Sequence, residues 1–151
     1  QNVGAQKMDR LHSGLWASMA IGLGYSLLAL GAMCLLAPQS AMLFLDPNEA
    51  QFQQLVELTS QYIIIQTLFF LPLAGVNNFR FAIQGMGFST LAICSGLLEM
   101  VGRGAVALWL IPRFGYLAAC FAAPIAWILA DLFLVPMSSR CIQVLRERYG
   151  A

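Results

Sequence analysis

Residues 14–37 read GLWASMAIGLGYSLLALGAMCLLA, and this stretch contains no charged side chain. An α-helix rises about 1.5 Å per residue, so about 20 apolar residues cross the hydrocarbon core of a bilayer. The stretch therefore predicts a transmembrane helix. A helix buried inside a soluble protein is the alternative, and the rest of the chain decides between the two.

Three further stretches, 62–83, 88–110 and 115–137, have similar lengths and carry at most two charged residues each. Only 10% of the 151 residues are charged and 60% are hydrophobic, whereas about a quarter of a soluble domain is charged. Four buried helices would leave a soluble protein of this size with too little polar surface. We therefore predict an all-α membrane protein with four transmembrane helices, forming a single domain over residues 1–151.

The distribution of lysine and arginine predicts the orientation, because basic residues gather on the cytoplasmic side of membrane proteins. Arg113 lies on the opposite side and Arg103 within the membrane. The other six fall on one side: Lys7, Arg10, Arg80, Arg140, Arg146 and Arg148. We expect a multi-pass protein of the plasma (cytoplasmic) membrane, surrounded by lipid, with cytoplasmic ends at residues 1–13 and 138–151.

The connection 38–61 is the one long loop and is expected on the outer side. Asp46, Pro47 and Glu49 have the residue types and spacing of a helix start. They predict an amphipathic helix over 47–60 at the membrane surface, with a bend near Ser60 before the second span.

Small residues at helical spacing predict close helix packing. In the fourth span they recur every fourth position, at Ala118, Ala122, Ala126 and Ala130. In the first span Ala20 and Gly24 have the same spacing. Pro72 and Pro124 lie inside predicted spans and favour kinks.

Composition also excludes several classes of function. A net charge of +1 provides no basic surface for nucleic acid. The four cysteines lack paired spacing and His12 is the single histidine, so we expect no zinc or disulfide framework. These residues offer no nucleophile–base pair, and we expect neither an enzyme nor a cofactor.

Glu99 lies at the middle of the third predicted span, with Ser95 and Arg103 one turn away on the same helix face. A lone charge at the bilayer centre costs on the order of 2.5–3.5 kcal/mol, and pairing of Glu99 with Arg103 lowers that cost. Two interpretations are open: a structural ion pair, or an acid coupled to the movement of a proton or cation.

Asp131, in the fourth span, has no charged neighbour on its own helix. Folding the spans as hairpins places Asp131 in one layer with Asn77 and Asn78. Their amides can donate to a carboxylate and their carbonyls can accept a cation. Asp131 is therefore a candidate carrier of a proton or cation, and the alternative is an acid that only hydrogen-bonds one helix to another.

Three sets of residues carry a family resemblance. QNVGA at 1–5 is followed by RFAIQGMG at 80–87, and then Glu99 with Gly102-Arg103 precedes PRFG at 112–115 and Ala126-Trp127. In order and spacing these segments resemble the C-terminal half of multidrug and toxic compound extrusion (MATE) transporters. The first resembles the family's cytoplasmic Q-N-x-G-A segment, and the second the glycine-rich turn between the fourth and fifth helices of a half.

The resemblance implies the last four helices of a six-helix lobe, with two helices of that lobe and the whole N-terminal lobe missing from this chain. Such a carrier expels organic cations or related small molecules in exchange for protons or sodium ions by alternating access. The candidate coupling residues are Asp131, Glu99, Arg103, Asn77 and Asn78. Some family members carry a coupling acid on the helix that corresponds to the second span, and this chain has none there.

Two other readings remain open at this stage. One is a non-transporting membrane subunit or assembly factor. The other is a dimeric four-helix small multidrug carrier, which would need an acid in its first span.

Overall fold

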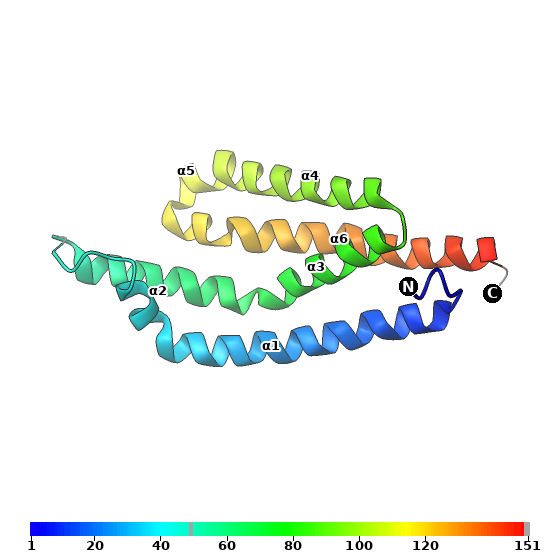
Figure 1. The fold of residues 1–151 in the computed structure, drawn as a ribbon. Coiled ribbons are helices and arrows are strands. Elements are labelled where there is room, and N and C mark those ends of the chain that lie inside the picture. The colour runs from blue at the N-terminus through cyan, green and yellow to red at the C-terminus, as the bar shows by residue number, and fades with distance from the viewer. Residues whose placement is uncertain (49, 150–151) are drawn as a thin grey trace.

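The computed structural model describes residues 1–48 and 50–149, and within them the regular structure is all helical (Figure 1). The elements are α1 (Met8–Met42), α2 (Phe52–Leu68), α3 (Phe70–Gly85), α4 (Ser89–Ala105), the π-helical segment η1 (Val106–Leu110), α5 (Ile111–Phe114) and α6 (Tyr116–Tyr149). They form a bundle whose long helices run side by side.

The described helices provide three or four spans. Three are long and apolar enough to cross a membrane: Met8–Met42, Ser89–Phe114 and Tyr116–Tyr149. The pair α2 and α3 is equally apolar when taken together and bends by 49° at its break, so it supplies a fourth span if it is counted as one. Both chain ends lie at the same end of the bundle in Figure 1, as four crossings require. The predicted all-α class and the apolar spans are thus confirmed.

The first helix extends beyond its predicted end. Residues 38–42, expected in the outer loop, continue α1, and Pro38 lies inside it. Ala37 and Ala41 are fully buried there, so packing against the rest of the bundle holds this last turn in place. The connection to α2 is correspondingly shorter than the predicted loop 38–61.

The second span bends at a different place from the predicted one. Helix α2 runs unbroken through Ser60, whose hydroxyl donates to the Val56 carbonyl at 2.6 Å. The break comes at Phe69. Pro72 explains it, because proline has no N–H to donate to the carbonyl four residues earlier, which is that of Leu68. The predicted bend near Ser60 was therefore wrong by about two and a half turns.

The expected surface helix is also different in the structure. Helix α2 packs lengthwise against α1 and leads directly into α3 (Figure 1). Asp46 does not cap a helix at 47, since its Oδ1 accepts from the backbone N–H of Asn48 at 2.9 Å in a tight turn. The part of that prediction that rests on Glu49 lies outside the described residues.

Helix α6 is the central element, and its small residues allow α4 to approach closely. Ala126 and Ala130 are fully buried and Ala118 nearly so. A Cβ added to Gly102 would lie 3.3 Å from the Ala126 Cα. In α1, however, the close contact is made by Gly22, which faces Ala74, whereas Gly24 has open space and Ala20 is exposed.

The outer surface of α1 is apolar. Ile21, Leu28 and Leu35 are each about three-quarters exposed. Exposure of so many large apolar side chains to water costs free energy, whereas their exposure to lipid does not. This surface fits a helix that faces hydrocarbon.

Candidate functional site

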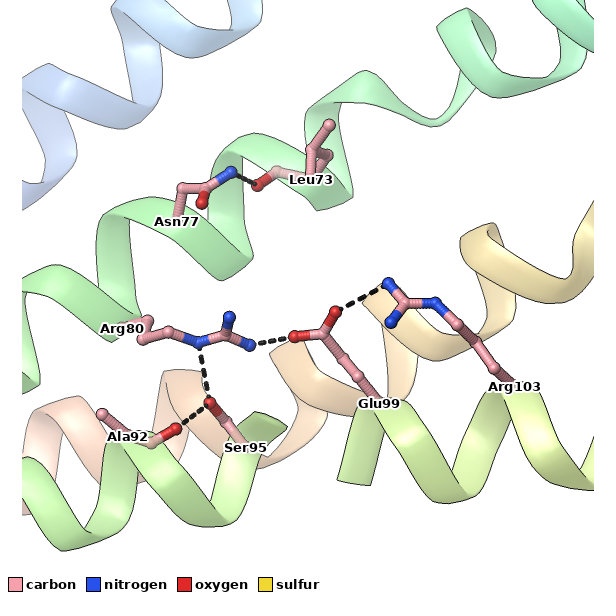
Figure 2. A network of polar contacts seen from close by, with 7 residues as sticks. All are labelled: Leu73, Asn77, Arg80, Ala92, Ser95, Glu99 and Arg103. Atoms are coloured by element: carbon pink, nitrogen blue, oxygen red, sulfur yellow. Dashed lines mark hydrogen bonds and ion pairs between the residues drawn. The ribbon is translucent and has the colours of Figure 1, made fainter. Parts of the chain in front are cut away.

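Two groups of polar residues lie inside the bundle, on different sides of α3. The first is an ion cluster, which we define as Arg80, Ser95, Glu99 and Arg103. Arg103 Nη2 donates to Glu99 Oε2 at 2.9 Å, which confirms the predicted pair one turn apart. Arg80, from α3, donates to the other carboxylate oxygen, Oε1 (Figure 2). The Glu99 carboxylate is therefore held by two guanidinium groups from two helices.

Ser95 extends this cluster. Arg80 Nε donates to Ser95 Oγ at 3.0 Å, and the Ser95 hydroxyl donates to the Ala92 carbonyl at 2.7 Å (Figure 2). The Glu99 side chain is 9% exposed and that of Arg80 is 23% exposed, while Arg103 is about half exposed. These bonds join α3 to α4 in the interior, where an unpaired charge would be expensive.

Arg80 lies near the end of its span, before the turn that joins α3 to α4, as the sequence indicated. It lies five residues before the end of α3 and turns toward α4 instead of toward the end of the bundle. Five basic residues remain at the end of the bundle that holds the termini: Lys7, Arg10, Arg140, Arg146 and Arg148. Arg113 still stands alone at the other end, so the charge asymmetry persists.

The second of these polar sites consists of one acidic residue. Asp131, on α6, lies against Gly75 of α3 so closely that a Cβ at position 75 would be 2.6 Å from Asp131 Oδ2. Its Oδ1 atom is buried and has no hydrogen-bond partner among the described residues. A buried carboxylate oxygen without a donor favours either a proton or a bound cation.

Asn77 and Asn78 do not join Asp131. Asn77 is exposed and its amide donates to the Leu73 carbonyl of its own helix at 2.9 Å (Figure 2). The Asn78 amide faces α1 and lies 3.5 Å from Met19 Sδ. Because successive residues turn about 100° around a helix, Asn77 lies about 160° away from Gly75, the residue that does face Asp131. Asn77 lies within about 3 Å of the depth of Gly75, so the predicted depth holds, but the expected contact of the two asparagines with Asp131 is not made.

Asp131 borders a groove of about 410 Å³ between α3 and α6. The other lining residues are apolar: Pro72, Ile128, Leu132, Val135 and Pro136. One carboxylate beside an apolar groove is suited to a compound with an apolar body and one positive charge.

Gly75 and Arg80 were the two residues of these sites that sequence reasoning missed. A signal existed for Gly75, because a glycine in the interior of a helix often marks the close approach of another element. Arg80 is the only charged residue in 62–83. A charge inside a span that lacks a partner on its own helix is a reason to look for one on a neighbouring helix.

No three His, Cys, Asp or Glu side chains gather as metal ligands would within residues 1–48 and 50–149. Comparisons of the chain with protein-family models, with curated proteins and with solved structures gave no match. The class that the fold and the site define is an α-helical protein with several helices long and apolar enough to span a membrane and, within the described residues, an internal ion cluster and one unpaired internal acid.

Proposed function

We propose that the chain is part of a secondary active carrier of the multidrug and toxic compound extrusion type, as the last four helices of a C-terminal lobe. It lies in the plasma membrane with both ends cytoplasmic. It exchanges organic cations for protons or sodium ions by alternating access. The observation that carries this proposal is the buried, unpaired oxygen of Asp131 at the edge of an apolar groove.

The two internal acids, Glu99 and Asp131, have different roles in this proposal. Glu99 is already neutralised by Arg80 and Arg103, so an ion that arrived there would have to displace an arginine. Asp131 has no such counter-charge on the groove side. An intramembrane acid in that position must take up a proton, bind a cation or remain at a high energetic cost. Asp131 is therefore the exchangeable group, and Glu99 is the structural one.

The shape of the groove favours an organic cation over a bare metal ion. Its walls are aliphatic side chains and two prolines, and the ring of Pro72 lies at the break between α2 and α3. Aliphatic walls bind the apolar body of a ligand, and the Asp131 carboxylate attracts its charge. Proton and organic cation compete for this one carboxylate, which is the simplest way to couple their movement in opposite directions.

The break beside Pro72 gives alternating access a structural basis. Helix α2 is tied to the start of α6 by two hydrogen bonds: the Tyr116 hydroxyl donates to the Leu58 carbonyl at 2.5 Å, and Gln66 Nε2 donates to the Cys120 carbonyl at 2.8 Å. Helix α3 packs on α6 beside Asp131. A change in the bend angle would therefore move α3 relative to the groove while α2 stays attached.

Two measurements test the proposal. Cells that carry the full-length gene should accumulate less cationic dye, and collapse of the ion gradient should abolish the difference. Purified protein should bind tetraphenylphosphonium, more weakly at lower pH because protons compete for the carboxylate. Glu57→Gln, which removes an exposed acid from α2, should bind as the wild type does. Equal dye levels with and without the gene would favour a non-transporting membrane subunit.

A further inference from the structure

The junction of the first and last helices holds a cavity that the proposed transport does not use. Its volume is about 480 Å³. It is lined by Gln6, Lys7, Met8, Asp9 and Arg10, around the start of α1, and by Arg146, near the end of α6. Three of these side chains are cationic and one is anionic, so the cavity carries an excess of positive charge.

The charges in this terminal cavity are only partly paired. Arg146 Nη2 donates to Asp9 Oδ1 at 2.7 Å, which ties α6 to α1. Lys7 and Arg10 form no salt bridge with any residue in the described part of the chain. The single acid of the cavity is thus engaged, and two cationic groups are free to bind an anion.

A second cavity, which we call the slot, begins at the same arginine. It has a volume of about 230 Å³ and lies between α1 and α3. Leu11, Gly14, Leu15 and Ala82 form an apolar part of its lining, and Asn2, Ser18 and Asn78 form a polar part. From Arg10 to Ser18 the slot follows α1 for about 12 Å. Arg10 lines both cavities, so the cationic cavity and the slot, with its apolar wall of Leu11, Leu15 and Ala82, adjoin the same arginine.

The depth of Arg10 matches that of lipid headgroups. The uncharged stretch of α1 begins at Gly14, and Arg10 lies about 6 Å beyond it along the helix axis. The headgroup layer on each side of the hydrocarbon core is roughly 5–7 Å thick. Trp16 is 60% exposed and its indole donates to His12 Nε2 at 3.2 Å. An exposed tryptophan that keeps a polar contact is typical of the membrane interface.

We propose that the terminal cavity binds the phosphate headgroup of an anionic phospholipid and that the slot holds one of its acyl chains. Lys7, Arg10 and Arg146 supply the positive charge, and anionic lipids are abundant on the cytoplasmic face of membranes. A soluble phosphate compound would fill the terminal cavity alone and leave the slot unused. The shared arginine instead places a charged and an apolar region side by side, as in a lipid. This inference does not depend on the transport activity.

The headgroup part is tested by titrating short-chain fluorescent phosphatidylglycerol into the purified full-length protein in a neutral detergent. The double variant Lys7→Gln/Arg10→Gln should bind about 30-fold more weakly, because each basic residue near the surface contributes several-fold. Arg140→Gln/Arg148→Gln is the matched control. It removes two exposed charges from the same end but outside the cavity, and it should bind as the wild type does. Unchanged thermal unfolding midpoints show that both proteins are folded.

The chain part is tested with Gly14→Leu, because Gly14 lines the slot and has no atom within 4 Å of its Cβ position. A leucine there should fill the slot and weaken binding of phosphatidylglycerol while leaving binding of glycerol phosphate unchanged. If the control pair loses as much affinity as the cavity pair, general surface charge is responsible and the site is wrong. If glycerol phosphate binds as tightly as the lipid, or if phosphatidylcholine does, the proposal is overturned.

Discussion

Asp131 and Glu99 are two carboxylates in the interior of the same helical bundle, with opposite surroundings. Both oxygens of Glu99 accept hydrogen bonds from arginine, and the side chain is nearly buried. Asp131 has a buried oxygen that accepts none within the described chain. A buried charge with good partners is expensive to disturb, whereas one without partners is free to exchange its proton or ion. We therefore propose a structural role for Glu99 and an exchange role for Asp131.

Removal of Glu99 should destabilise the protein. Glu99→Gln leaves Arg80 and Arg103 without their shared counter-charge, and we expect a loss of about 3–5 kcal/mol in the free energy of unfolding. Denaturant titration in detergent measures it. Arg80 is the more buried partner, so Glu99→Gln/Arg80→Gln should recover more stability than Glu99→Gln/Arg103→Gln. Equal recovery, or a stable single variant, would contradict the structural role of the cluster.

Gly75 should be indispensable for the position of Asp131. In Gly75→Ala the new methyl group would lie within 2.6–2.8 Å of both carboxylate oxygens, so α3 and α6 must separate or Asp131 must turn. We expect about 1–3 kcal/mol of destabilisation and weaker binding of tetraphenylphosphonium. Gly85→Ala, on the same helix with open space around it, is the control. Wild-type behaviour of Gly75→Ala would mean that the carboxylate is not confined there.

At the scale of the helices, one proline shapes the second span. Pro72 removes the hydrogen bond to Leu68 and separates α2 from α3 by a 49° bend. The same ring lines the groove beside Asp131. The break and the groove thus share a residue, and the two helices on either side have different attachments. Helix α2 is bonded to the start of α6, while α3 is linked to α4 through the ion cluster.

The contact between α4 and α6 depends on small side chains, because helices in lipid gain most from close van der Waals packing. Gly102→Leu should force the two helices apart, since even a Cβ at this position would be 3.0–3.3 Å from Leu129 and Ala126. We expect a loss of about 1–3 kcal/mol, measured by thermal or denaturant unfolding. Gly96→Leu, on an exposed face of α4 with no neighbour within 4 Å, should be neutral. Similar losses in both variants would show that the close contact between α4 and α6 is not responsible.

Features that depend on one helix alone could be predicted from the sequence. Features that depend on how one helix is aligned and rotated relative to another could not. The spans follow from gaps between charges, and the Glu99–Arg103 pair follows from a spacing of four residues within one helix. The bond from Arg80 to Glu99 depends on how α3 is aligned with α4, which is set by the turn around Gly87. Counting residues along hairpins estimates depth but not direction around the helix, which is why Asn77 was expected to face Asp131. Pro72 indicated a break in the second span. We nevertheless predicted the bend near Ser60, because the amphipathic pattern of residues 47–60 indicated a separate helix that ends there.

At the scale of the whole molecule, the described helices supply four spans if α2 and α3 count as one, and four crossings would return the chain to its starting side. The two termini lie together at one end of the bundle (Figure 1) and are joined by the Arg146–Asp9 ion pair. Five basic residues gather at that end and Arg113 lies at the other. By the positive-inside rule we propose that the termini, and the terminal cavity with them, lie on the cytoplasmic side.

Single-cysteine labelling tests this topology. The four native cysteines, Cys34, Cys94, Cys120 and Cys141, are all free and can be replaced. In that background a cysteine at Gln53, which is exposed before the bend, should react with an impermeant maleimide on intact cells. A cysteine at Gln143, exposed near the C-terminus, should react only after the cells are opened. The reverse pattern would invert the orientation and move the terminal cavity to the outer face.

Gradient-driven transport by Asp131→Asn is the most direct test of the exchange role assigned to Asp131. The substitution keeps the size of the side chain and removes its charge, so the packing against Gly75 should survive. In proteoliposomes that contain the full-length protein, the wild type and Glu57→Gln should accumulate a cationic dye when a proton or sodium gradient is imposed. Asp131→Asn, compared per folded protein, should lose this response. If Asp131→Asn accumulates the dye at the wild-type rate with the same dependence on the gradient, Asp131 does not couple transport.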